Sequence, residues 1–544
     1  MGGIHAMLGT GRLLSICATV LVLSLAACGG NQTSEDVPTL RRGISAKVGS
    51  LDPHTSSAQW ENILIGDMFI GLMTHGADGT PEPGMAISHE VSDNGLVWTF
   101  TLGDYEWSDG TPVTAGDFVY ALRRIQAPET ASQYSSLLYL IKNAEEVNNG
   151  ELSGEELGVE ALDEKTLKIT LNYPAPYLPG LLTHYTSYPV PQHVVEQYGE
   201  SWIQPENIVV NGPYKLMYWR TGDQLVADLN PTGFGAADAC FQRVVYFELE
   251  DETAVENKIQ AGELDINNAF SGARQDELER KFPGWPRTTP SLNTTYWTFN
   301  ARTAPFDDVR VRKALSMALD REFIVRNVLT PGYEPAYSFV PPGINNYNVA
   351  RPTVEFKDWS RDERLAAAKT LLIEAGYGPD NPFEFEFTHR STDDNPKAAP
   401  VAQANWAEIA PWVNPIIIKQ DTQVLYARLR QGDFSVSDAA WVADFDDPIN
   451  FLYLMDSATG QQNYGAYANA EYDAILSRSS AERDMGARAE MFAEAEGLML
   501  EEYPITPMWF AVTKNLVDPT LTGWEENAVD QHRSRFLCRA GIAK

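Results

Sequence analysis

The sequence has few cysteines, few histidines and a shortage of basic residues. Its 544 residues include 4 cysteines and 8 histidines, and 41 lysines and arginines stand against 74 aspartates and glutamates, which gives a formal net charge of -33. The histidines are scattered singly, so the sequence predicts no metal cluster. A strongly acidic chain is repelled by phosphate backbones, and this excludes nucleic acid as a partner.

The common catalytic motifs are missing as well. The sequence has no Gly-x-Ser-x-Gly elbow, no His-Glu-x-x-His, no Cys-x-x-Cys and no phosphate-binding loop that ends in Lys-Ser/Thr. Asp444, Asp446 and Asp447 suggest a calcium loop, but they lack the companion oxygen ligands and the glycine and glutamate spacing of such loops. We therefore expect a protein that is not an enzyme and needs no metal or cofactor.

Long apolar runs are also absent, except at the N-terminus. The run Leu13–Ala27 follows Arg12 and is short for a membrane span, so residues 1–27 are predicted to be a signal peptide. Its end, Leu-Ala-Ala-Cys at Cys28, is similar to the lipobox of bacterial lipoproteins, whose cysteine is lipidated. The alternative is ordinary cleavage nearby. A polar tether at 31–36 favours lipidation, which would anchor a soluble body to a membrane.

Two cysteines remain for the body of the protein. Cys17 leaves with the signal peptide and Cys28 is the lipidation candidate, so Cys240 and Cys538 are left. In an oxidising compartment such a pair is a candidate disulfide. Two unrelated buried thiols are the alternative, and the neighbouring sequence does not decide between them.

The remaining chain reads as a large globular protein with alternating helices and strands. Hydrophobic residues make up 44% and charged residues 21% of the whole sequence, and its length favours more than one domain. A turn at Leu51–His54 is followed by an expected helix over 63–72, and Thr114 with Asp117 caps another helix. This alternation predicts α/β layering.

One stretch carries the clearest chemistry. Residues 434–440 alternate like a strand, and Pro448 prevents further strand pairing just downstream. Trp441 and Asp444 therefore lie at the end of a strand, where they offer an apolar wall and a negative charge to a ligand with a cationic group. The alternative role of Asp444 is to cap a turn or helix.

Several motifs together resemble the extracytoplasmic oligopeptide-binding proteins of ABC importers, solute-binding protein family 5. The resemblance extends from about residue 40 to the C-terminus, and its motifs occur in the family's order. They are Leu51–His54, Trp107–Ala115 with the sequence WSDGTPVTA, Asp117–Tyr120, Asn211–Leu216, and Trp441–Phe445 followed by Asp447–Pro448 and an asparagine-rich loop.

This resemblance implies the fold. We expect an α/β two-lobed periplasmic binding protein (type II, cluster C) with an additional third domain and a hinged interlobe cleft. Lobe I would comprise 28–69, 192–292 and 514–544, extra domain II 70–191, and lobe III 293–513. Cys240 and Cys538 both fall in lobe I, so a disulfide between them is predicted.

The resemblance also implies how a ligand is held. An extended peptide would lie between a strand from each lobe, with Ala440, Trp441 and Val442 on one side and Asp444 paired with the α-ammonium group. On the other side an extended strip would line the groove, at Ser57, Ala58 and Gln59.

Three departures from the family pattern bear on the substrate. Asp438 stands where relatives often have a basic residue, and a cysteine pair of enteric relatives falls on Asn293 and Val442. Basic residues that would meet a peptide carboxylate are not recognisable. His389, Arg390 and Lys397 are nearby substitutes, although we expect them at the surface.

The sequence thus predicts a monomeric, lipid-anchored periplasmic protein that captures oligopeptides or dipeptides and delivers them to ABC permease subunits with cytoplasmic ATPases. Alternatives within the family are a nickel chelate, an oligosaccharide or a murein peptide as ligand. A periplasmic peptide hydrolase, or a chaperone or signalling receptor, are alternatives of another class.

Overall fold

A computed structural model describes residues 37–329, 331–391 and 394–542. The predicted signal peptide, residues 1–27, and the lipidation candidate Cys28 lie outside the described residues. None of the helices within those ranges has the length and apolar character that crossing a bilayer requires.

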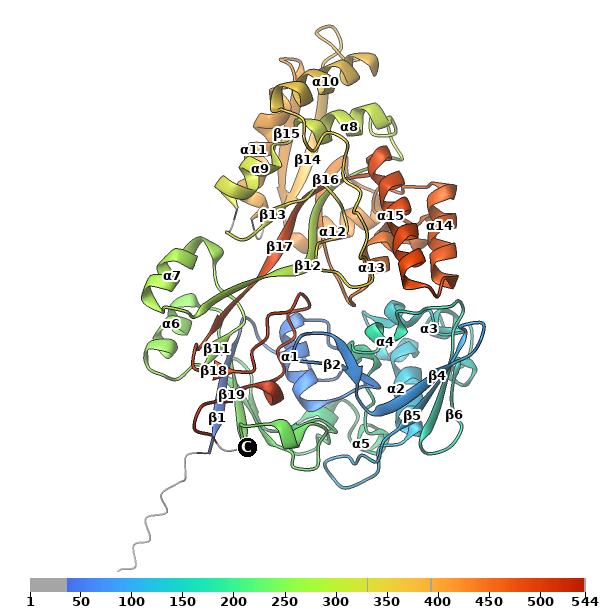
Figure 1. The fold of residues 1–544 in the computed structure, drawn as a ribbon, viewed down its shortest axis with the longest axis vertical. Coiled ribbons are helices and arrows are strands. Elements are labelled where there is room, and N and C mark those ends of the chain that lie inside the picture. The colour runs from blue at the N-terminus through green and yellow to red at the C-terminus, as the bar shows by residue number, and fades with distance from the viewer. Residues whose placement is uncertain (1–36, 330, 392–393, 543–544) are drawn as a thin grey trace, which may run out of the picture. The chain divides into compact units, whose positions relative to one another are not determined.

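A large mixed sheet forms the centre of the fold (Figure 1). Its strands follow the order β15-β14-β16-β12-β17-β11-β1-β10-β9-β8, and β13 pairs with β17. Their bounds, in chain order, are β1 Thr39–Ile44, β8 Tyr214–Arg220, β9 Gln224–Leu229, β10 Arg243–Glu248, β11 Ile266–Asn267, β12 Pro286–Phe299, β13 Glu334–Pro335, β14 Phe383–Arg390, β15 Val413–Gln420, β16 Val436–Val442 and β17 Ile505–Val517.

The two long strands β12 and β17 connect the halves of this sheet. They run antiparallel, and the first half of β12 pairs with the last residues of β17, from Pro286↔Leu516 to Pro290↔Val512. The register then shifts, and pairing resumes at Thr294↔Phe510. An irregularity of this kind bends a strand pair locally.

A second, antiparallel sheet has the order β4-β5-β7-β6. Its strands are β4 Ala86–Val91, β5 Val97–Leu102, β6 Val159–Ala161 and β7 Thr166–Thr170. Helix α2 (Ala115–Gln126) packs beside β6 and β7. The predicted cap of this helix is confirmed, because the Asp117 carboxylate accepts the Thr114 backbone N–H at 2.8 Å.

The other helices connect strands of the two sheets or pack beside them. They are α1 Gln59–Met68, α3 Ala144–Asn148, α4 Leu178–Leu181, α5 Gln192–Tyr198, α6 Glu252–Gln260, α7 Gln275–Lys281, α8 Val309–Ala318, α9 Arg321–Phe323, α10 Arg361–Glu374, α11 Asn395–Ala407, α12 Thr422–Gln431, α13 Ile449–Leu452, α14 Ala470–Ala481 and α15 Met485–Glu502. Helix α11 packs on β14 and β15, and α14 lies beside α15 (Figure 1). Two short strand pairs remain, β2 Met73–His75 with β3 Pro81–Pro83 and β18 Leu521–Thr522 with β19 Cys538–Arg539.

The structure joins Cys240 and Cys538 in a disulfide. The two residues are 298 positions apart in sequence. The bond links the C-terminal strand β19 to the segment that leads into β10. It joins the two cysteines that the sequence analysis names as the candidate disulfide.

The helix predicted over 63–72 is wrong at both ends. Helix α1 begins at Gln59, because the Glu61 carboxylate accepts N–H groups of the preceding turn, those of Gly49 and Ser50. It ends at Met68, since the Asn211 side chain bonds both the N–H and the C=O of Ile70, each at 2.9 Å, and holds that segment extended.

Candidate ligand-binding site

Strand β16 has a free edge at its C-terminal end. Along its other edge it pairs with β12 over its whole length, from Phe299↔Val436 to Asn293↔Val442. On the free side, β14 pairs with β16 only at Phe387↔Val436 and Thr388↔Ser437. Among the described residues, no strand pairs with β16 on this side beyond Ser437. An open strand edge is a template on which an extended peptide can add itself.

The backbone groups of Ala440 and Val442 point toward this free edge. The N–H of Ala443 donates to the Leu292 carbonyl, which precedes β12 residue Asn293. Backbone direction alternates along a strand, so Ala443 and Trp441 face β12, and Val442 and Ala440 face the free edge. Consistent with this, the Ala440 N–H donates to the Tyr426 hydroxyl on α12 at 3.3 Å instead of to β12. Val442 is 53% exposed and is thus open to a ligand.

Asp444 follows the end of β16 in a bend. Its side chain is partly buried, and burial raises the pKa of its carboxyl group from 3.8 to about 7, opposed by a hydrogen bond with the Asn450 side chain. Within the described ranges, none of the ion pairs includes Asp444. A half-buried carboxylate without a cation is suited to a cationic ligand.

The neighbouring Asp447 and Asp446 serve the structure. The Asp447 carboxylate binds the Arg488 guanidinium through two bonds of 2.6 and 2.8 Å, and both side chains are 1% exposed. Asp446 accepts the backbone and side-chain N–H groups of Asn345 at 2.7 and 2.6 Å. These carboxylates are already bonded to protein, which argues against the calcium loop, and the described residues hold no group of metal-binding side chains.

Asn450 holds Trp441 and Asp444 together. It is buried in α13, and its Oδ1 accepts the Trp441 indole N–H at 2.8 Å and the Asp444 backbone N–H at 3.2 Å. The Trp441 ring also meets Tyr453 edge to face, with centroids 5.8 Å apart. The apolar wall and the negative charge that the sequence predicts at this strand end are therefore fixed relative to each other.

Aromatic residues of the 70–191 segment lie near the Asp444 loop. Burial and then the Asp444 charge raise the pKa of Tyr134 to about 12, and both also raise the pKa of Tyr185. Phe445 stacks on Tyr177 of the 70–191 segment, with centroids 5.1 Å apart and ring planes at 6°. Segments distant in sequence thus converge on the Asp444 loop.

The strip at residues 57–59 is only partly as predicted. Ser57 and Gln59 are exposed and Ala58 is partly buried. Ala58 is extended, with φ -105° and ψ 139°, but Gln59 already belongs to the first turn of α1. The extended conformation expected for Gln59 is wrong, since Glu61 caps the helix one residue earlier through the Ala58 N–H.

The basic residues near the site are buried or paired. Asp438 is fully buried, and its carboxylate accepts the backbone N–H of Arg390 at 2.9 Å and the Nε–H at 2.8 Å. Arg390 and His389 are buried, so the surface placement expected for them is wrong. Lys397 binds Asp394 at 2.6 Å. Position 438 thus has no basic residue, but Arg390 on β14 places a guanidinium group beside it. The Asp438 carboxylate already neutralises that charge.

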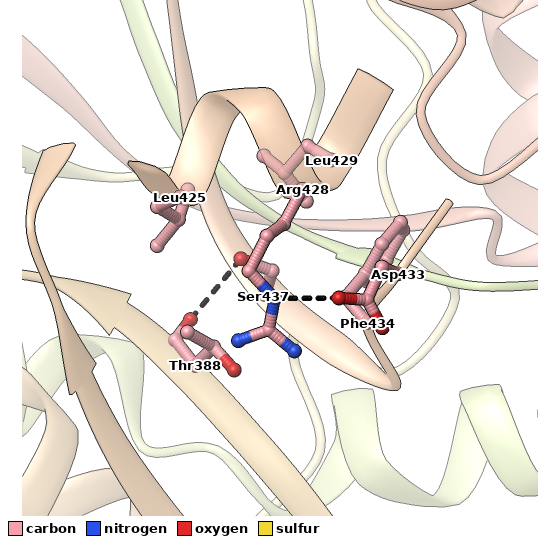
Figure 2. A pocket seen from close by; sticks show the side chains of 7 residues that line it. All are labelled: Thr388, Leu425, Arg428, Leu429, Asp433, Phe434 and Ser437. Carbon is pink, nitrogen blue, oxygen red and sulfur yellow. Dashed lines mark hydrogen bonds and ion pairs between the residues drawn. The ribbon is translucent and has the colours of Figure 1, made fainter. Parts of the chain in front are cut away.

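A small pocket lies between α12 and the sheet (Figure 2). Its volume of about 160 Å³ includes open solvent, whereas pockets for small molecules usually enclose at least about 300 Å³. Figure 2 shows the Arg428–Asp433 ion pair and the Ser437–Thr388 hydrogen bond across it. The residues lining it are Thr388, Leu425, Arg428, Leu429, Asp433, Phe434 and Ser437. This pocket is too small to be the ligand site.

Sequence reasoning missed three residues that shape the site: Tyr426, Asn450 and Arg488. Asn450 was visible only as part of an asparagine-rich loop. Tyr426 and Arg488 lie on helices whose contacts with β16 and with the Asp444 loop no local pattern signals.

Comparisons with known proteins fit this geometry. The family described as "Bacterial extracellular solute-binding proteins, family 5 Middle" matches residues 80–463. The periplasmic oligopeptide-binding protein OppA of Salmonella typhimurium is 36% identical over 522 residues, 94% of this chain and 95% of that protein.

Two solved structures share the fold. The murein tripeptide binding protein MppA of Escherichia coli has a TM-score of 0.78 and 33% identity, covering 93% of this chain and 99% of that one. Haemophilus influenzae OppA in complex with RPPGFSPFR has a TM-score of 0.78 and 30% identity, covering 94% and 100%. The chain therefore belongs to family 5 of the bacterial extracellular solute-binding proteins and has their two-lobed periplasmic binding protein fold of type II.

Proposed function

We propose that this protein is the substrate-binding component of a peptide ABC importer. It captures oligopeptides or dipeptides between its lobes and delivers them to permease subunits with cytoplasmic ATPases. Membership in family 5, together with relatives described as oligopeptide-binding and murein tripeptide binding, supports this proposal.

One observation carries the proposal: a half-buried carboxylate without a cationic partner lies just beyond an open strand edge. Asp444 matches the charge of a peptide α-ammonium group, and Ala440 and Val442 offer backbone groups to an extended chain. Backbone pairing does not read side chains, so one site can serve many sequences. Ser57, Ala58 and Gln59 are proposed to line the opposite side of the ligand.

Capture requires the lobes to close on the ligand. The register shift between β12 and β17, at Pro290/Thr294, supports a hinge in these two strands. A ligand that contacts both lobes only in the closed state shifts the population toward that state. Such a cycle releases the ligand unaltered, and we propose that no chemical step takes place.

The proposal divides the chain into lobe I (28–69, 192–292 and 514–544), extra domain II (70–191) and lobe III (293–513). The sheet order supports this division, because β1, β8, β9 and β10 are neighbours in one half of the large sheet. The smaller sheet uses only strands between Ala86 and Thr170.

The cellular context follows from the same role. The protein would act as a monomer in the periplasm, held at the membrane through a lipid on Cys28. Mass spectrometry of the protein purified from membranes tests the anchor, since a diacylglycerol adduct on an N-terminal Cys28 is expected, and an unmodified mature N-terminus would contradict it.

Native mass spectrometry of the purified protein tests the function. A series of co-purifying peptide masses is the expected result. A single sugar, metal chelate or other solute would overturn the peptide assignment. Incubation with a peptide mixture followed by mass analysis separates binding from hydrolysis, because a binding protein returns every peptide intact.

A further inference from the structure

The free edge of β16 is short, and this limits how much of a peptide backbone it can pair with. β14 and the Asp438–Arg390 pair cover the edge up to position 438. Beyond that point only Ala440 and Val442 direct their backbone groups outward, because alternate residues face β12. A ligand strand can therefore meet two hydrogen-bonding positions.

Tyr426 already accepts the backbone N–H at one of these positions. Its hydroxyl oxygen accepts the Ala440 N–H at 3.3 Å, at the place where the carbonyl oxygen of a neighbouring strand would lie. The ring is held from two sides: the Tyr464 ring centroid is 6.2 Å away, and the Arg390 guanidinium lies 5.9 Å from the ring centroid. Tyr426 comes from α12, so it reaches the edge without adding a strand.

The direction of a bound peptide follows from Asp444, which lies beyond the C-terminal end of β16. A peptide whose α-ammonium group meets Asp444 and whose chain follows β16 runs antiparallel to it. Its first residue then faces Val442 and its third residue faces Ala440, since opposite residues alternate in an antiparallel ladder. The carbonyl of the third residue would need the Ala440 N–H.

We propose that Tyr426 is a specificity-determining residue that keeps the Ala440 N–H from bonding the carbonyl of the ligand's third residue. This inference rests on the proposed function, in which Asp444 binds the α-ammonium group. A third residue gains side-chain contacts but does not gain the hydrogen bond from Ala440. The protein should then bind dipeptides and longer peptides with similar affinity, and its substrate class includes dipeptides.

The test compares alanine peptides of two and three residues, both amidated at the C-terminus so that carboxylate charge does not differ. Calorimetry gives their affinities for the wild type, for Tyr426→Phe and for the control Tyr464→Phe. The control removes a hydroxyl from the same ring pair without touching Ala440. We expect the tripeptide-to-dipeptide affinity ratio to rise about fivefold in Tyr426→Phe only, because the third residue then gains one hydrogen bond from the Ala440 N–H.

Hydrogen exchange of the Ala440 amide gives a second readout that does not depend on affinity. In the unliganded protein, exchange should be slower in the wild type than in Tyr426→Phe. The tripeptide should slow it in the variant and leave it unchanged in the wild type.

The outcomes separate the two proposals. An unchanged ratio in Tyr426→Phe, or equal weakening of both peptides, overturns the role of Tyr426 while peptide binding stands. A ratio that rises equally in Tyr464→Phe overturns it as well. If neither peptide binds any of the three proteins, the proposed function fails, and the inference fails with it.

Discussion

Two aspartates of one loop, Asp444 and Asp447, have opposite surroundings. Asp447 is buried against Arg488 and receives a further bond from the Asn346 side chain at 3.1 Å. Asp444, three residues earlier, is partly buried, has a pKa raised to about 7 by that burial, and is bonded to Asn450. Sequence alone does not separate them, because both are acidic residues between a strand and a short helix.

The difference teaches how to tell a structural carboxylate from one that awaits a ligand. A buried charge is tolerated when the protein supplies its counter-charge, and removing one partner of such a pair is costly. A desolvated carboxylate without a cation costs stability, and this cost is recovered when a ligand supplies the cation. Asp447 therefore orders the loop that presents Asp444.

The largest expected effect is on stability and concerns Arg488. Arg488→Ala leaves Asp447 buried and unpaired, so the free energy of unfolding should fall by about 3 to 5 kcal/mol. Chemical denaturation measures it. The matched control is Arg310→Ala, which removes an exposed arginine bound to Asp308 and should cost about 1 kcal/mol or less. An equal loss of unfolding free energy in the two variants would show that the buried Asp447–Arg488 pair is no more important than an exposed one, and would contradict the comparison.

Asp444→Asn should instead affect binding. Removing the charge should weaken a peptide with a free N-terminus by about 2 to 5 kcal/mol, since the ligand ammonium would be buried unpaired. Thermal melting of the unliganded variant should not drop, because no ion pair is lost. Asp433→Asn, at an exposed aspartate paired with Arg428, is the control and should bind like the wild type. A melting temperature that falls as in Arg488→Ala would make Asp444 a structural residue.

The pH dependence sharpens the comparison. With a folded-state pKa near 7, Asp444 is largely protonated at pH 6, whereas the α-amino group of a peptide is mostly protonated below about pH 7.5, so peptide affinity should fall as the pH is lowered from about 7.5 to 6. For stability the sign is opposite. The raised pKa adds to the free energy of unfolding. This added stability is fully present below the unfolded pKa of 3.8 and is lost as the pH rises through the folded pKa of about 7. Titration calorimetry and melting curves of the wild type and Asp444→Asn measure both, and the variant should lack both effects.

The smallest expected effect concerns Asn450, which positions Asp444. Asn450→Ala removes the bonds to the Trp441 indole and to the Asp444 backbone, which should weaken binding by about 1 kcal/mol. It also removes the hydrogen bond that lowers the pKa of Asp444, so the pH midpoint of binding should move upward. Weaker binding with an unmoved midpoint would indicate a loss of packing alone.

Local patterns predict much of this molecule. The Thr114–Asp117 cap and the strand that ends near Trp441 depend on neighbours in sequence, and both are found. The start of α1 at Gln59 was missed because its cap is Glu61, a residue within the helix. The Glu61 carboxylate accepts the Ala58 N–H, so the helix begins where the sequence predicts an extended segment.

The missed parts of the site depend on distant partners. Arg390 meets Asp438 across 48 positions, and Arg488 meets Asp447 across 41. Tyr426 reaches Ala440 from α12 over the edge of the sheet. Only the assembled sheet brings these side chains together, so the role of each carboxylate could not be assigned from spacing.

The most direct test of the central claim compares one tripeptide with its N-acetylated form in titration calorimetry at about pH 7.5, where most of the free α-amino group is protonated. If Asp444 pairs with the α-ammonium group, the free tripeptide should bind at least about 30-fold more tightly than the acetylated one, and Asp444→Asn should abolish that preference. Equal binding of the two peptides to the wild type, or an undiminished preference in the variant, would contradict the account.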